Sequence, residues 1–227
     1  MKLYHDLTQC SFLCRVNRFI AKCMVDGVET TVHVKNTGRL RELLVPGAVC
    51  YLEASANPAR KTRYDLVAVE KDGRIVNIDS QAPNLIARDW VQNGGLGDVT
   101  AVRSEVVWGD SRFDLSCMQD NTQCLIEVKG VTLFNEQGIA IFPDAPTSRG
   151  AKHLRGLIEA HNAGMKSCLL FVIMKEDAVG LMPNGITDPD FSAALRQAHA
   201  AGVDIVAGCC RVTADAAQII RTVPVIL

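Results

Sequence analysis

The chain has 227 residues, a formal net charge of −1 and 48% hydrophobic residues. This composition suits one or two folded domains, excludes a disordered chain and gives no overall argument for nucleic acid. No apolar run reaches 18 residues, so we expect no membrane span, and residues 1–6 lack the pattern of a signal peptide. Nine irregularly spaced cysteines predict reduced thiols in a cytoplasmic protein rather than a zinc site.

The first 80 residues are typical of short strands separated by turns. Asp26-Gly27 and Asp72-Gly73 are hairpin signals, and Pro46-Gly47 marks another turn. The extended segments that we expect are 12–24, 28–34, 48–53, 64–69 and 74–78. About five short strands without a long helix predict a small OB-like β-barrel as the first domain, residues 1–80.

This domain also carries a net positive charge. Residues 1–79 hold 12 Lys and Arg against 9 Asp and Glu, net +3, and the remainder holds 12 against 16, net −4. We therefore expect the first domain to contact phosphates, unless its loops are simply solvated. The candidate residues are Arg15, Arg18, Asn36, Thr37, Arg39, Arg41, Arg60, Lys61 and Arg63. The aromatic residues Phe12, Phe19, Tyr51 and Tyr64 are interpreted as core, which favours phosphate contact over base stacking.

A different pattern begins after residue 80 and predicts an α/β domain over residues 81–227. Pro83 suits a first helical position, and the apolar residues that follow it have helical spacing until Asn93-Gly94-Gly95. Strands are then expected at 102–108, 112–118 and 124–133. Farther on, the sequence predicts a helix at 149–161, a buried strand at 167–174, a helix at 191–201 and a strand at 203–207.

Asp114, Glu127 and Lys129 lie on two of these strands, which the polar turn around Asp120 joins into a hairpin. Side chains alternate along a strand, so Glu127 and Lys129 share a face, and Asp114 can lie opposite Glu127. An exposed strand with incidental charges is the alternative. The apolar neighbours of Glu127 argue against that alternative, because they indicate a buried strand.

Two carboxylates beside an ammonium group suit divalent-metal chemistry. Mg²⁺ or Mn²⁺ takes a few carboxylate oxygens together with water and phosphate oxygens. We expect Asp114 and Glu127 to bind the metal, with Glu105 on the neighbouring strand as a further ligand. Lys129 would position water or neutralise charge on a phosphate. The spacing is that of the PD-(D/E)xK nuclease core, which makes Asp114, Glu127 and Lys129 the candidate catalytic residues.

The helix expected at 149–161 begins shortly after this strand, with Thr147 or Ser148 as its cap. Free N–H groups at a helix start attract anions. We therefore expect this region to hold a phosphodiester; an ordinary basic, exposed helix start is the alternative. The candidate nucleic-acid contacts here are Arg149, Lys152 and His153, with Arg112 from the strand that carries Asp114.

Six stretches together resemble the sugar fermentation stimulation protein A (SfsA) family over nearly the whole chain. They are Asn36–Arg39, Asn57–Thr62, Ser111–Asp114, Ile126–Leu133, Phe142–Leu154 and Pro224–Leu227. The resemblance implies an OB-like barrel followed by a nuclease-like α/β domain with a mixed sheet, DNA binding, and a link to regulation of sugar (maltose) metabolism.

The sequence leaves two classes of function open: a DNA-binding regulator, or a Mg²⁺-dependent nuclease. RNA or a repair intermediate is a third, weaker substrate. Without a helix-turn-helix, we expect little sequence specificity for DNA. The oligomeric state stays open.

Overall fold

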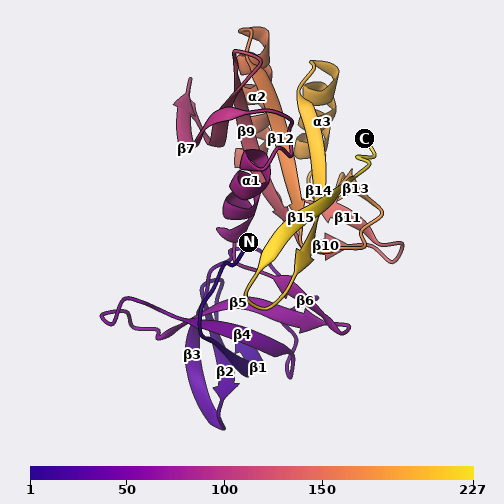
Figure 1. Cartoon of the computed structure of the whole chain (residues 1–227). Helices are drawn as coiled ribbons and strands as arrows, with labels where there is room; N and C mark the ends of the chain where they lie inside the picture. The colour runs from indigo at the N-terminus through magenta and orange to yellow at the C-terminus, as the bar shows by residue number, and fades with distance from the viewer. The chain divides into compact units, whose positions relative to one another are not determined.

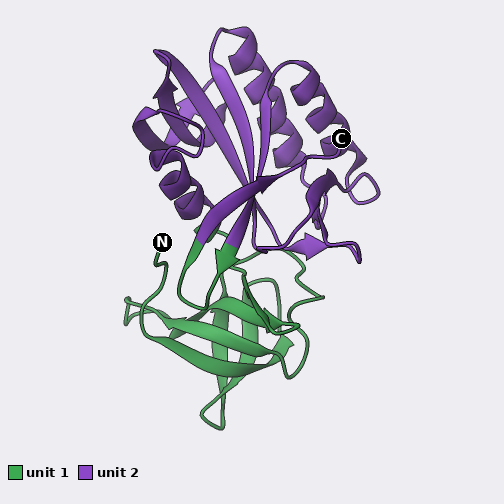
Figure 2. Ribbon diagram, turned by 45° about the vertical axis from the view of Figure 1, so that its right-hand side comes forward, with its two compact units in different colours: residues 1–82, 211–217 green, residues 83–210, 218–227 purple.

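The computed structural model describes all residues 1–227 as two compact units (Figures 1 and 2). Unit 1 comprises residues 1–82 and 211–217, and unit 2 comprises residues 83–210 and 218–227. The sequence places a boundary after residue 80 but gives no sign that a segment near the chain's end belongs to unit 1. No helix is long and apolar enough to cross a membrane.

Unit 1 is a closed five-stranded barrel of the OB type, extended by a sixth strand. Its strands are β1 (Leu7–Arg15), β2 (Ile20–Val25), β3 (Val28–Val34), β4 (Val49–Ala54), β5 (Tyr64–Lys71) and β6 (Arg74–Asn77). The order in the sheet is β3-β2-β1-β4-β5-β6, and a parallel pairing of β3 with β5 closes the barrel. The OB-like barrel expected from the sequence is thus confirmed.

Local sequence explains the hairpins of this barrel. Asp26 and Gly27 both have positive φ angles, as do Asp72 and Gly73, which is the geometry of tight hairpin turns. The expectation of one extended segment over residues 12–24 is wrong, because β1 and β2 are separated by a turn at residues 16–19. There the Asn17 side chain accepts hydrogen bonds from the backbone N–H groups of Phe19 (2.8 Å) and Ile20 (3.0 Å). These bonds stabilise the turn.

Unit 2 is built on a mixed six-stranded sheet of order β15-β14-β12-β9-β8-β7. Its strands are β7 (Thr100–Trp108), β8 (Ser111–Gln119), β9 (Thr122–Val131), β12 (Lys166–Ile173), β14 (Asp204–Val212) and β15 (Ala217–Val223). Strands β7, β8 and β9 form an antiparallel meander, and β12 runs parallel to both β9 and β14. The predicted mixed sheet is confirmed, with β9 in its interior.

Three helices accompany this sheet: α1 (Ala82–Gln92), α2 (Ser148–Asn162) and α3 (Pro189–Ala200). Thr147 caps α2 by accepting a hydrogen bond from Gly150 N, and Asp188 caps α3 in the same way. Phe113, Leu125 and Phe171 of the sheet pack with Leu154 and Leu195 of α2 and α3 in one buried core. Three short strands, which the sequence does not predict, form a separate sheet: β10 (Leu133–Phe134), β11 (Ile139–Phe142) and β13 (Gly180–Pro183).

Two glycines let helices approach the strands closely. A Cβ atom on Gly130 of β9 would lie 2.6 Å from Pro83 Cγ, at the start of α1. A Cβ atom on Gly156 of α2 would lie 3.1 Å from Phe113 Cζ of β8. A Cβ atom on Gly130 would force Pro83 to shift, and one on Gly156 would require Phe113 to move by a few tenths of an ångström. These close approaches bring polar side chains of α1 and α2 to the charged residues of the hairpin.

Candidate functional site

The β8–β9 hairpin sets the position of Asp114. Its backbone ladder includes the pair Leu115–Ile126, and the same register puts Asp114 opposite Glu127. The Asp114 carboxylate accepts hydrogen bonds from the backbone N–H of Val128 (2.8 Å) and from the side-chain amide of Asn84 on α1 (2.8 Å). Asp114 is therefore held from two sides, by β9 and by α1.

Glu127 lies in the interior of the sheet and is only 2% exposed. Its Oε1 atom accepts a hydrogen bond from Lys129 Nζ at 2.5 Å and also contacts His153 Nδ1 of α2. Its Oε2 atom is buried and has no hydrogen-bond partner. A buried carboxylate oxygen without a partner is costly, so this atom marks a place where a positive ligand would be favourable.

His153 contacts the carboxylate from within the protein. The sequence predicts an open helix start with His153 against a phosphate, but His153 is buried and contacts Glu127. Its other ring nitrogen, Nε2, accepts a long hydrogen bond of 3.4 Å from Arg149 Nε. Because Nε2 is the acceptor, the proton lies on Nδ1, which donates to Glu127. His153 thus orients the metal-binding candidate rather than facing solvent.

The two carboxyl groups have pKa values shifted in opposite directions. Burial raises the pKa of Asp114, and the negative charge of Glu127 raises it further. Burial alone would also raise the pKa of Glu127, but the hydrogen bond from His153 and the charge of Lys129 outweigh burial and lower it. Glu127 is therefore the more firmly ionised of the two. A cation between the two carboxylates would offset the charge repulsion that raises the pKa of Asp114.

The residues fit a divalent metal held by two carboxylates. No group of three or more His, Cys, Asp or Glu side chains is arranged to hold a metal. Glu105, the third predicted ligand, is exposed on β7 and forms a 2.8 Å ion pair with Arg112. The structure thus brings Asp114, Glu127 and Lys129 together but directs Glu105 towards Arg112. Two carboxylates suit Mg²⁺, which keeps several waters and also takes phosphate oxygens.

The other phosphate candidates in unit 2 lie at the start of α2. Arg149 and Lys152 are exposed, and Lys152 Nζ donates a 3.0 Å hydrogen bond to the Asp110 carbonyl. Arg149 has N–H groups beyond the one that donates to His153. Both side chains present positive charge on the first two turns of the helix that carries His153.

In unit 1 several predicted phosphate contacts bind other parts of the barrel. The Arg15 guanidinium donates hydrogen bonds of 2.6–3.0 Å to the carbonyls of Arg18, Asn36, Gly38 and Arg39. The Asn36 side chain bonds Ile78 O and Gly38 N. Arg60 forms a two-pronged ion pair with Asp65, at 2.8 and 2.9 Å. These three side chains stabilise the loops of the barrel.

The remaining candidates of unit 1 are exposed: Arg18, Thr37, Arg39, Arg41, Lys61 and Arg63. Among the aromatic residues, Phe12 is buried in the core as expected, but the same expectation for Phe19 is wrong. Phe19 is 47% exposed, because the turn at Asn17 places it at the barrel surface. Its backbone carbonyl accepts a 2.8 Å hydrogen bond from Val34 N.

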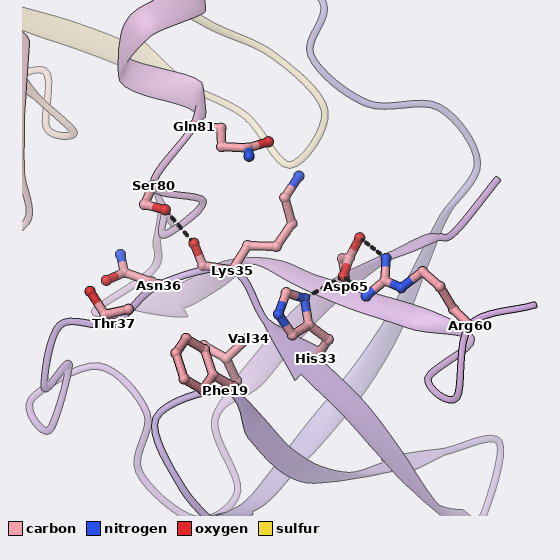
Figure 3. A pocket seen from close by; sticks show the side chains of 10 residues that line it. All are labelled: Phe19, His33, Val34, Lys35, Asn36, Thr37, Arg60, Asp65, Ser80 and Gln81. Atoms are coloured by element: carbon pink, nitrogen blue, oxygen red, sulfur yellow. Dashed lines mark hydrogen bonds and ion pairs between the residues drawn. The ribbon is translucent and has the colours of Figure 1, made fainter. Parts of the chain in front are cut away.

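Asn84 and the residues of a cavity in unit 1 carry little or no signal in the sequence. Asn84 carries only a weak signal, a polar side chain one residue after a helix-starting proline. Lys35, His33 and Asp65 line a cavity in unit 1 together with Phe19 (Figure 3). Their convergence depends on the closure of the barrel by β3 and β5, which no local pattern indicates.

Comparisons with known proteins cover both units. Residues 81–216 match the family model "Sugar fermentation stimulation protein RE domain", and residues 13–78 match "SfsA N-terminal OB domain". A sugar fermentation stimulation protein homolog from Desulfitobacterium hafniense is 44% identical over 95% of this chain and 94% of its own length. A homolog from Ruminiclostridium cellulolyticum is 43% identical over 98% of each chain.

A solved structure is similar over the entire chain. The structure of Pyrococcus furiosus SfsA in complex with Ca²⁺ has a TM-score of 0.90 and 27% sequence identity, with 100% of both chains covered. The two family models match this chain in the order of its two units. The chain belongs to the sugar fermentation stimulation protein (SfsA) family.

Proposed function

We propose that this chain binds DNA and that Asp114 and Glu127 hold a divalent metal ion, Mg²⁺ or Mn²⁺, against a DNA phosphate. The observation that carries this proposal is the buried Oε2 atom of Glu127, which has no partner and lies near a second carboxyl group whose pKa is raised. The Ca²⁺ complex of the Pyrococcus furiosus protein supports it, because Ca²⁺ is also an oxygen-binding divalent cation.

Each residue of the site has a separate task in this proposal. Glu127 and Asp114 supply negative oxygens, and His153 and Asn84 fix the orientation of these two carboxylates. Lys129 donates one N–H to Glu127 and has two further N–H donors for a water or a phosphate oxygen. Arg149 and Lys152 supply the nearby positive charge that attracts the DNA backbone.

Hydrolysis of the phosphodiester is a second candidate function, favoured by the position of Lys129 beside the two carboxylates. When bound, the metal would act as a Lewis acid and would lower the pKa of a coordinated water. Lys129 would hold that water or neutralise charge on the phosphate. Without hydrolysis, DNA binding alone would serve regulation of sugar (maltose) metabolism, as the family resemblance implies.

Asp114→Asn is the sharpest variant for testing the metal site. The asparagine Oδ1 can accept from Val128 N, while its amide can donate to Asn84 after Asn84 flips, so both hydrogen bonds survive. Glu105→Gln is the matched control, because Glu105 forms an ion pair with Arg112. We expect calorimetry to show that Mn²⁺ binding is lost in Asp114→Asn and kept in Glu105→Gln.

Incubation of plasmid, linear and single-stranded DNA with Mg²⁺ or Mn²⁺ then separates the two functions. Cutting by the wild type that Asp114→Asn abolishes would establish the nuclease. DNA binding without cutting would support the regulator. Unchanged Mn²⁺ binding in Asp114→Asn would contradict the metal assignment. Affinity for DNA should fall as the salt concentration rises, because phosphate contacts release counterions, and a flat response would contradict those contacts.

A further inference from the structure

A cavity of about 630 Å³ opens on the barrel of unit 1 (Figure 3). It lies between the β1–β2 turn, the end of β3, the β4–β5 loop and the residues after β6. Its lining residues include Phe19, His33, Lys35, Thr37, Arg60 and Gln81. We propose that this cavity binds one unpaired nucleotide of a DNA strand, with the base stacked on Phe19. The inference rests on the proposed DNA binding and names the state of the DNA that unit 1 recognises.

The ring of Phe19 offers a base the surface that Arg18 does not cover; the Arg18 guanidinium carbon lies 5.7 Å from the ring centroid. Phe19 is 47% exposed although it is large and apolar, and Figure 3 shows its ring at the side of the cavity below Asn36 and Thr37. Bases of single strands stack on such rings in OB barrels. A base within a duplex is already stacked on both faces, so this surface suits an unpaired base.

The cavity wall that carries Phe19 is held in place without a ligand. Arg15 donates hydrogen bonds both to Arg18 O of the turn and to the carbonyls of Asn36 and Gly38 in the loop after β3. Val34 N donates to Phe19 O at 2.8 Å. The turn and the loop are thus joined by hydrogen bonds. Because they are already ordered, ligand binding costs little conformational entropy.

The charges of the cavity favour a nucleotide over a lone phosphate. Lys35 pairs with Asp79 at 2.6 Å, and Arg60 pairs with Asp65. Because aspartates balance both cations, the cavity lacks the excess positive charge that would draw a phosphate by itself. A neutral base fits better, with the sugar–phosphate chain running towards the exposed cations Lys61 and Arg63.

Polar groups without partners complete the recognition surface. The Thr37 hydroxyl and the Gln81 side-chain amide form no hydrogen bond within the protein. His33 bonds Asp65 through Nδ1 at 2.8 Å, which leaves Nε2 for a ligand. These groups offer donors and acceptors to the edge of a base, an edge that pairing would otherwise occupy.

The test measures the affinity of the full chain for a fluorescein-labelled thymidine oligonucleotide and for a duplex of the same length, by fluorescence anisotropy in low salt and EDTA. We expect the wild type to bind the single strand more tightly than the duplex. Phe19→Ala should weaken single-strand binding about ten- to a hundredfold, which is the loss expected for one base–aromatic stack, while Phe19→Tyr should restore it. Val16→Ala is the matched control, because Val16 is exposed on the same turn but does not line the cavity.

The outcomes separate this inference from the proposed function. Equal single-strand affinity of Phe19→Ala and wild type, or equal wild-type affinity for single strand and duplex, would overturn the inference and leave DNA binding in place. Failure of the wild type to bind either DNA, in EDTA and also with Mg²⁺ present, would overturn DNA binding itself. Asp114→Asn, which alters unit 2, should keep its single-strand affinity in EDTA, so a lost metal site is recognised independently. Circular dichroism checks that each variant is folded.

Discussion

The contact between His153 and Glu127 allows a quantitative test of how unit 2 holds its buried carboxylate. His153→Ala removes a donor from a carboxylate that is 2% exposed and already has one oxygen without a partner. A hydrogen bond to a charged group contributes about 1.5–3 kcal/mol. The imidazole also packs near Phe113, with ring centroids 6.1 Å apart, and its removal costs about 1 kcal/mol more. We expect the free energy of unfolding to fall by about 2.5–4 kcal/mol.

Two further variants separate the hydrogen bond from the packing. An asparagine at position 153 places its amide nitrogen near the position of Nδ1, so His153→Asn should keep the bond to Glu127 and lose about 1 kcal/mol. A glutamine places its amide nitrogen near the position of Nε2, so His153→Gln should lose nearly as much stability as His153→Ala. Alanine is the better helix former by some tenths of a kcal/mol, so an advantage of asparagine over alanine cannot come from helix propensity.

Urea unfolding monitored by tryptophan fluorescence measures the stability of these variants, because both tryptophans, Trp90 and Trp108, lie in unit 2. EDTA removes divalent ions. A double-mutant cycle of His153→Ala with Glu127→Gln should give a coupling energy of about 1.5–3 kcal/mol. Additive effects within about 0.5 kcal/mol, or an asparagine variant as unstable as the alanine variant, would refute the assigned role of His153.

Two predictions concern unit 1. Arg15→Met should lower the stability of this unit by about 2–4 kcal/mol, because four backbone carbonyls lose a donor; hydrogen exchange of unit 1 amides measures this, and unchanged protection would contradict it. Burial would raise the pKa of Asp65, but its bonds to Arg60 and His33 outweigh burial and lower it. Ionised Asp65 therefore stabilises the fold above its unfolded pKa of about 4, and this stability is lost as the pH falls through the lower folded value. Asp65→Asn should flatten the acid limb of the unfolding profile; an identical limb would be the contrary result.

The local parts of this architecture could be predicted from sequence. Asp26-Gly27 and Asp72-Gly73 determine two hairpins with tight turns, and side-chain alternation in β9 places Lys129 against Glu127. Hairpin pairing brings Asp114 opposite Glu127 because the connecting turn fixes the register. These features depend on residues that are close together in the chain. The alternation of side chains along a strand and the residues of the turns are therefore enough to predict them.

The remainder depends on contacts between distant segments. His153 contacts Glu127 from α2, which lies close to β8 at Gly156. The local sequence around His153 predicts an exposed helix start and gives no sign of this contact. An aromatic side chain such as Phe19 predicts a core position, because aromatic residues are usually buried, while the Asn17 turn that exposes it is a weak signal. The strands β10 and β11, of two and four residues, are too short for any periodicity to show.

The parallel pairing of β3 with β5 determines where the barrel opens locally. It consists of two residue pairs, His33–Asp65 and Val34–Leu66, fewer than any other ladder of the barrel. Local opening should therefore begin between β3 and β5, and the His33–Asp65 hydrogen bond stabilises the closed state. His33 and Asp65 both line the cavity, so a molecule bound there would stabilise the closed barrel. Any change that weakens the pairing of β3 with β5 would reduce the fraction of molecules able to bind it.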